Sequence, residues 1–159
     1  MKVFNPYNTL ALHNCFGCAK KNPIGLALEF ELIGDEVICE WLPTANYQGF
    51  EGMLHGGIIS TIMDEVGAWA VQLILKTAGV TSELNVKYLK PVRISNGAIK
   101  VKAKPGEQIE RLVNVNVELL DGNGKLCVEA HIQYFVFPEK IAKEKFRYPG
   151  IEAFFAPKN

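Results

Sequence analysis

The stretch that decides the fold runs from residue 52 to residue 65 and reads Gly52-Met53-Leu54-His55-Gly56-Gly57-Ile58-Ile59-Ser60-Thr61-Ile62-Met63-Asp64-Glu65. From residue 56 onward, apolar side chains recur at helical spacing and cover nearly every face of the segment. A helix that is apolar on almost all sides must be buried. We therefore predict one long buried helix over 56–76, with Lys76 and Gly79 marking its end.

The segments on both sides of this helix alternate between apolar and polar residues, which is the pattern of half-buried strands. Turn sequences at Gly34-Asp35, at Pro105-Gly106 and at 121–124 separate them. The element order is then two strands, the helix and four strands, which predicts an α+β fold with an antiparallel sheet wrapped around the helix. A second subunit is the other way to cover the helix. The predicted strands lie at 26–32, 37–41, 84–88, 99–103, 113–119 and 126–136.

The whole chain, 1–159, is predicted to form a single domain. Residues 1–25 are rich in Asn, Pro and Gly and are expected to form an irregular arm before the core at 26–137. The tail at 138–159 carries several aromatic residues, and we expect it to dock on the domain or on a neighbouring chain.

Charge and composition exclude several classes of protein. Apolar residues make up 48% of the chain, which is typical of globular proteins. The 17 basic and 17 acidic residues balance, so no overall field draws the chain to nucleic acid or to an anionic membrane. The sequence shows no signal peptide and no stretch long enough to be read as a membrane span, so a cytoplasmic location is expected.

The start of the predicted helix is the first candidate for chemistry. The first turn of a helix carries N–H groups without intrahelical partners and the positive end of the helix dipole. Gly56 and Gly57 would let another molecule approach these N–H groups closely. This arrangement suits a carbonyl oxygen that becomes an oxyanion during acyl transfer. The glycine pair alone is equally compatible with a tight entry into the helix.

Asp64 is the second candidate, because a carboxylate in so apolar a stretch is costly to bury unless it is hydrogen-bonded or functional. The alternative is a solvent-facing Asp64–Glu65 pair at a helix bend. Gly57 and Asp64 share a helix face but lie about 10 Å apart along the axis. One small substrate carbonyl cannot contact both through a single helix. We therefore predict an obligate homodimer with two shared sites, in which Gly57 of one subunit meets Asp64 of the other.

The stretch at 52–65 resembles the central motif of the PaaI-like, or 4-hydroxybenzoyl-CoA thioesterase-like, hotdog family. In that motif, His-Gly-Gly is followed by Asp seven residues after the second Gly. The resemblance covers about residues 24–137 and also includes the strand order. It implies a hotdog fold and an acyl-CoA thioesterase that needs no cofactor and acts on an acyl- or aryl-CoA substrate. It also implies a homodimer, with a homotetramer formed as a dimer of dimers.

The resemblance also implies roles for individual residues. Asp64 corresponds to the nucleophile or general base, and the Gly57 N–H corresponds to the oxyanion donor. His55 lies where the family orients the thioester. Thr81 lies where related enzymes hold a hydroxyl that positions water, with Ser82 as the substitute if the register differs by one.

The remaining candidates are expected to bind substrate. Many relatives carry Asn six residues before the His, whereas this chain has Gly49 there and Gln48 beside it, as in a separate branch of the family. The Gln48 amide is expected to contact the acyl carbonyl or Asp64. Coenzyme A needs cations for its phosphates. We predict that the substrate contacts include Gln48, Gly56, Glu65, Ser82, Lys90 and Arg93.

Cys15-x-x-Cys18, which follows His13, is half of a zinc site, but a structural zinc needs four ligands. The sequence has no second Cys-x-x-Cys, since Cys39 and Cys127 each fall within strand patterns. We therefore expect a packed arm or a surface turn and predict no metal.

Two other functions stay open at this point. A hotdog hydratase or dehydratase would also use a His and an acid, although its relatives usually carry other His motifs. A non-catalytic acyl-CoA sensor would have no use for a buried acid aimed at the thioester.

Overall fold

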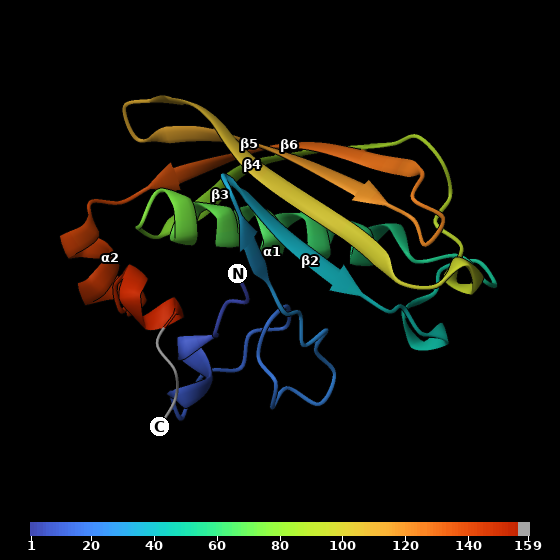
Figure 1. Cartoon of the computed structure of the whole chain (residues 1–159), viewed down its shortest axis with the longest axis horizontal. Coiled ribbons are helices and arrows are strands. Elements are labelled where there is room, and N and C mark those ends of the chain that lie inside the picture. Colours follow the sequence, from blue (N-terminus) through green and yellow to red (C-terminus); the bar gives the residue numbers. More distant parts are fainter. Residues whose placement is uncertain (156–159) are drawn as a thin grey trace.

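A computed structural model describes residues 1–155 of the chain. Over these residues, one six-stranded antiparallel sheet with the order β1-β2-β4-β5-β6-β3 lies over the long helix α1 (Figure 1). The predicted α+β class and element order are confirmed. The helices and strands are β1 (Glu31–Ile33), β2 (Glu36–Trp41), α1 (Gly56–Ile74), β3 (Gly79–Tyr88), β4 (Ile99–Ile109), β5 (Leu112–Leu120), β6 (Leu126–Val136) and α2 (Glu139–Phe146), with short 3-10 helices η1 (Pro6–Thr9), η2 (Ala45–Tyr47), η3 (Ile94–Asn96) and η4 (Ile151–Phe154).

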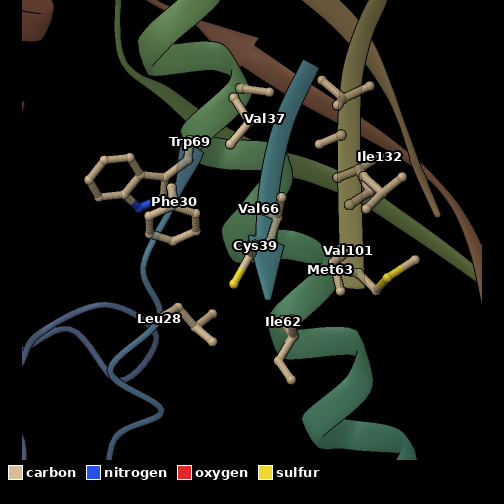
Figure 2. Packing of buried hydrophobic residues seen from close by; sticks show 14 of the residues in the cluster. Leu28, Phe30, Val37, Cys39, Ile62, Met63, Val66, Trp69, Val101 and Ile132 are labelled. Atoms are coloured by element: carbon tan, nitrogen blue, oxygen red, sulfur yellow. The ribbon is translucent and has the colours of Figure 1, made fainter. Parts of the chain in front are cut away.

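The core lies between the concave face of the sheet and α1. In β5, every second residue from Val113 to Leu119 is buried while the residues between them are exposed, as period-2 patterning requires. Figure 2 shows Ile62, Met63 and Val66 of α1 packed near side chains of β2 and β4. These α1 side chains have no exposed surface, so burial of this helix face stabilises the fold through the hydrophobic effect.

The side of α1 away from the sheet is covered by the N-terminal arm and the tail (Figure 1). Trp69 stacks on Phe30 with ring centroids 4.2 Å apart, and Phe154 meets the same indole edge-on at 5.5 Å (Figure 2 shows the Trp69–Phe30 pair). The Tyr148 hydroxyl donates to the carbonyl of Gln72 at 3.1 Å. The tail therefore docks on the chain's own core helix. By length and composition alone α1 could cross a membrane, but its place under the sheet is that of a core helix.

The first strand is shorter than predicted. Leu26, Leu28 and Phe30 are buried in alternation as expected, yet β1 begins only at Glu31. Ala27 has a φ of 50°, which breaks the extended run. The amides of Leu26 and Leu28 donate to carbonyls of the arm instead of to a neighbouring strand. The alternation predicted burial correctly but not the hydrogen-bond partner.

Two predicted boundaries were also wrong. Pro105-Gly106 is not a turn, because β4 continues through a bulge to Ile109 and the turn follows at Glu110, which has a φ of 54°. Since β2 pairs with β4 only as far as Ala103, β4 has an open edge there, where proline is tolerated. The helix ends at Ile74, two residues early, and Lys76 has a left-handed φ of 56°.

Strand β3 forms one edge of the sheet and is far more exposed than a half-buried strand. Val80, Leu84 and Tyr88 leave 40% or more of their surface open. Exposed apolar side chains along an unpaired strand edge are typical of a surface that pairs with another chain.

Candidate active site

The helix start has a cap that the sequence analysis did not predict. His55 is the N-cap of α1, and its Nδ1 accepts a hydrogen bond from the Gly57 N–H at 2.8 Å. Because Nδ1 accepts, the neutral ring carries its proton on Nε2. Gly56 and Gly57 are both exposed, as an oxyanion site requires. The Gly57 N–H is nevertheless already satisfied, so a substrate oxygen must share it with His55 or displace the ring.

Tyr88 ties the end of β3 to the start of α1. Its hydroxyl donates to the Gly56 carbonyl at 2.6 Å and lies 2.6 Å from the Ser60 hydroxyl. With the phenol proton committed to Gly56, Ser60 is the donor in the second bond. These bonds hold the helix start against the edge strand.

Asp64 lies two turns further along α1, where its carboxylate is held by two hydroxyls. Oδ1 accepts from the Thr81 hydroxyl of β3 at 2.8 Å and from the Tyr134 hydroxyl of β6 at 2.9 Å. Within residues 1–155, no side chain donates to Oδ2. Asp64 is half-buried, so one carboxylate oxygen is anchored and the other is available.

Tyr134 is fully buried beneath this carboxylate, and its single O–H is shared between Asp64 Oδ1 and the Asp64 carbonyl, which lies 2.8 Å from the phenol oxygen. Burial, the charge of Asp64 and the hydrogen bond to it all raise the pKa of Tyr134 above its usual value. The phenol therefore stays protonated and remains a donor. Gly67 makes room for this contact, because a Cβ at that position would collide with the Tyr134 hydroxyl.

A cavity of about 670 Å³ opens at the helix start. Its lining includes His55, Gly56, Tyr88 and Lys90, and most of the remaining lining residues are apolar. The volume is within the range of small-molecule sites. Asp64 does not line it, in agreement with the axial distance of about 10 Å between Gly57 and Asp64.

The structure brings together only part of the predicted site. Asp64 and Thr81 meet directly, and His55 meets Gly57. Ser82 instead donates to Gln133, so the predicted register holds and Ser82 is not the residue at Asp64. Tyr134 and Tyr88 were missed, because both were read only as apolar strand positions.

The expected substrate contacts are scattered. Lys90 lines the cavity, while Arg93 is exposed at the start of η3, and neither forms an ion pair within the described part of the chain. Gln48 accepts from the Gly52 N–H at 3.1 Å and does not contact Asp64. The Glu65 carboxylate points to the arm, where it lies 3.6 Å from the Cys15 sulfur, and it also accepts from Nε1 of Trp69 on α1 at 3.1 Å. This carboxylate therefore lies away from the predicted substrate site.

The chain matches a known protein family over its central part. A model of the thioesterase superfamily matches residues 51–128, which contain His55, Asp64, Thr81 and most of the residues that line the cavity at the helix start. The chain belongs to the thioesterase superfamily.

Two curated relatives resemble the chain over part of their length. The Saccharolobus solfataricus protein named "Putative esterase" is 36% identical over 89 residues, which are 55% of this chain and 58% of that protein. Human acyl-coenzyme A thioesterase 13 is 27% identical over 96 residues, 59% of this chain and 68% of that protein. The chain thus matches a little under three fifths of the length of the Saccharolobus relative.

Solved structures of other proteins share the fold. A hypothetical thioesterase protein of Streptococcus pneumoniae, whose structure contains coenzyme A, superposes with a TM-score of 0.64 at 21% identity. The match covers 70% of this chain and 90% of that chain. The predicted hotdog fold is therefore confirmed.

Proposed function

We propose that this superfamily member hydrolyses an acyl- or aryl-CoA thioester to the free acid and coenzyme A, with Asp64 as nucleophile or general base. The observation that carries the proposal is the Asp64 carboxylate, anchored through Oδ1 by Thr81 and Tyr134 and open at Oδ2. A thioester carbonyl is already activated, so a carboxylate, an oxyanion donor and a positioned water suffice.

The anchoring sets the geometry of the reaction. Two hydroxyl donors fix the plane of the carboxylate, which directs Oδ2 to one place. As general base, Oδ2 takes a proton from water while the water oxygen bonds to the thioester carbon. The C–S bond then breaks, and the thiolate of coenzyme A leaves and takes up a proton. Thr81, already in contact with Asp64, is the residue that positions this water.

The oxyanion donor is proposed to come from a second subunit. Gly57 is too far from Asp64 of its own chain to serve the same carbonyl. The exposed edge strand β3 offers a surface on which an identical strand can pair, with two α1 helices antiparallel beneath it. A homodimer then has two sites, each built from Asp64 of one chain and Gly57 of the other. The homotetramer and the cytoplasmic location stay predictions.

Binding of the thioester must also rearrange the helix start. The Gly57 N–H now donates to His55 Nδ1, so the carbonyl oxygen takes over this donor as the imidazole turns aside. The freed ring, protonated on Nε2, can then orient the thioester. His55 is thereby a cap in the free enzyme and a substrate contact in the complex.

The coenzyme A part of the substrate is assigned to the cavity at the helix start. Its volume of about 670 Å³ and its largely apolar wall suit part of an extended ligand. Lys90 at the wall and Arg93 nearby supply cations for phosphates. The Streptococcus pneumoniae relative with bound coenzyme A supports this ligand class.

The test measures thiol release from a panel of acyl-CoA thioesters. Asp64→Asn keeps the shape and both hydroxyl contacts but removes the base, and we expect kcat to fall by about a hundredfold or more. Asp35→Asn is the matched control, because Asp35 lies on the β1–β2 turn, where its carboxylate pairs with Lys104 of β4 and not with any site residue. Full activity of Asp64→Asn overturns the proposal. So does hydration of enoyl-CoA without thiol release, or tight acyl-CoA binding without turnover.

A further inference from the structure

A second cavity, of about 290 Å³, lies where the N-terminal arm packs on α1. Its lining includes His13, Cys15 and Cys18 from the arm and Glu65 from the helix. One ligand atom each of Cys15, Cys18 and Glu65 lie within 4.8 Å of one another. The Cys-x-x-Cys half-site of the sequence thus gains a carboxylate from a residue 47 positions further along the chain.

The spacing of these atoms fits one small tetrahedral ion. Zinc bound at about 2.3 Å from sulfur and 2.0–2.2 Å from nitrogen or oxygen places neighbouring ligand atoms about 3.5–3.8 Å apart. Both carboxylate oxygens of Glu65 lie 3.6 Å from the Cys15 sulfur. His13 Nε2 lies 3.9 Å from the Cys18 sulfur. Cys15 and Glu65 are therefore at coordination spacing, and the Cys18 sulfur lies within 4.8 Å of both. His13, next to the Cys18 sulfur, is the fourth candidate ligand, and closing the site requires His13 and Cys18 to move toward the other two.

Surrounding contacts hold these ligands in place. Trp69 Nε1 donates to Glu65 Oε1 at 3.1 Å, the kind of outer hydrogen bond that orients a metal ligand. The Ala19 amide donates to the Cys15 carbonyl at 3.1 Å and closes the turn that carries both thiols. At Gly17, an added Cβ would lie 2.5 Å from the Glu65 carboxyl carbon, so glycine is what lets the carboxylate reach the thiols.

We propose that His13, Cys15, Cys18 and Glu65 bind a single zinc ion that fastens the N-terminal arm to α1. Two thiolates favour zinc over magnesium or calcium, and four protein ligands fill a closed tetrahedral site. On binding, both thiols release their protons and zinc takes their place. The site is separate from Asp64 and does not depend on the proposed thioesterase activity.

The first test is the metal content of the full-length protein, purified under reducing conditions after growth with added zinc. We expect about one zinc per chain in the natural protein. Cys15→Ser, Cys18→Ser and Glu65→Gln each should lose most of it. Cys127→Ser, which changes a buried cysteine of β6, is the control and should keep it. Metal content at background level in the natural protein overturns the proposal.

The second test is cobalt(II) titration of the metal-free, reduced protein, followed by absorption. Two thiolate ligands give an intense sulfur-to-cobalt charge-transfer band, which Cys15→Ser should cut to about half, because one of two thiolates is lost. Gly17→Ala keeps both thiols but displaces Glu65, and we expect cobalt affinity to fall at least about tenfold. Absence of the band overturns the proposal, as does a Cys15–Cys18 disulfide in reduced protein found by mass spectrometry.

Asp64→Asn separates this proposal from the proposed function. The variant should bind zinc as the natural protein does, because Asp64 faces β3 and β6. Loss of zinc without loss of hydrolysis, or the reverse, therefore identifies which of the two proposals has failed.

Discussion

Asp64 and Glu65 are adjacent acids whose side chains serve different surroundings. Successive residues on an α-helix point about 100° apart. Asp64 therefore faces the hydroxyls of Thr81 and Tyr134, while Glu65 faces Trp69 and the thiol of Cys15. A carboxylate in an apolar helix needs such donors to offset its desolvation. Each acid has its own set of donors, so their roles can be separated by substitution.

Tyr134→Phe tests whether the buried phenol supports the base. It removes the one O–H that Asp64 Oδ1 and the Asp64 carbonyl share, while keeping the ring that packs in the core. A hydrogen bond to a charged group contributes about 1.5–3 kcal/mol, so we expect kcat for thioester hydrolysis to fall about tenfold to hundredfold. Tyr148→Phe, remote from Asp64, is the control and should leave kcat unchanged. Equal kcat for both variants contradicts the role of Tyr134.

At this scale, the sequence predicted the acid but not its surroundings. Asp64 was found because a carboxylate in an apolar helix stands out from its neighbours. Tyr134 is 70 residues away, and the contact exists only because β6 passes over α1. Glu65 was predicted to contact the substrate, because nothing in the neighbouring sequence indicates that the N-terminal arm folds back onto this residue.

Among the elements, periodicity predicted the central strands well and the edges poorly. β5 and β6 lie between other strands and over α1, so their alternating burial follows directly from one covered face. The segment before β1 alternates equally well but bonds to the arm. β3 alternates too, although both of its faces are largely open. An alternating apolar pattern predicts that one face of a segment will be buried. It does not predict which part of the molecule will cover that face.

The β5–β6 turn depends on one carboxylate. Asp121 accepts from the backbone N–H of Asn123 at 2.9 Å and of Lys125 at 3.0 Å, and Asn96 donates from its side chain at 3.2 Å. Three donors hold the pKa of Asp121 below its usual value. The backbone N–H of Lys125 has the largest effect, and the backbone N–H of Asn123 and the side-chain amide of Asn96 add to it. Because the native pKa is lowered, the ionised group stabilises the fold above about pH 4, and this contribution is lost as the pH falls.

Asp121→Asn keeps an acceptor at the turn but removes the charge. We expect the variant to have a lower Tm than the natural protein at pH 7, with the gap closing as the pH is lowered below about 4. Thermal unfolding followed by circular dichroism across this range measures the gap. Glu118→Gln, on exposed β5 surface, reports the general effect of removing one negative charge. A Tm difference that does not change with pH would contradict the argument.

For the whole molecule, three features favour assembly in pairs. The cavity at the helix start excludes the chain's own Asp64. The edge strand β3 exposes apolar side chains, including Leu84 and Tyr88. With 17 basic and 17 acidic residues, the chain carries no net charge that would keep two copies apart. The first two follow if a twofold axis brings two β3 edges and two α1 helices together, and the absence of net charge allows that pairing.

Mixing two inactive variants decides whether a site spans two chains. Asp64→Asn lacks the base. Gly57→Pro lacks the oxyanion N–H at a first-turn position, where proline removes no intrahelical hydrogen bond and only the cap bond to His55 is lost. If sites are shared, a mixed dimer has one site with both lesions and one with neither. Random pairing, after the chains are unfolded and refolded together, should then restore about a quarter of the natural activity.

The complementation result depends on geometry and not on either variant's residual rate. If base and oxyanion donor belonged to the same chain, every site in every dimer would carry one lesion, and mixing would restore nothing. Circular dichroism and sedimentation must first show that each variant folds and pairs as the natural protein does. No arrangement within a single chain yields an intact site from these two lesions. Activity that rises with the fraction of mixed dimers therefore requires that Asp64 and Gly57 act on one thioester from opposite subunits.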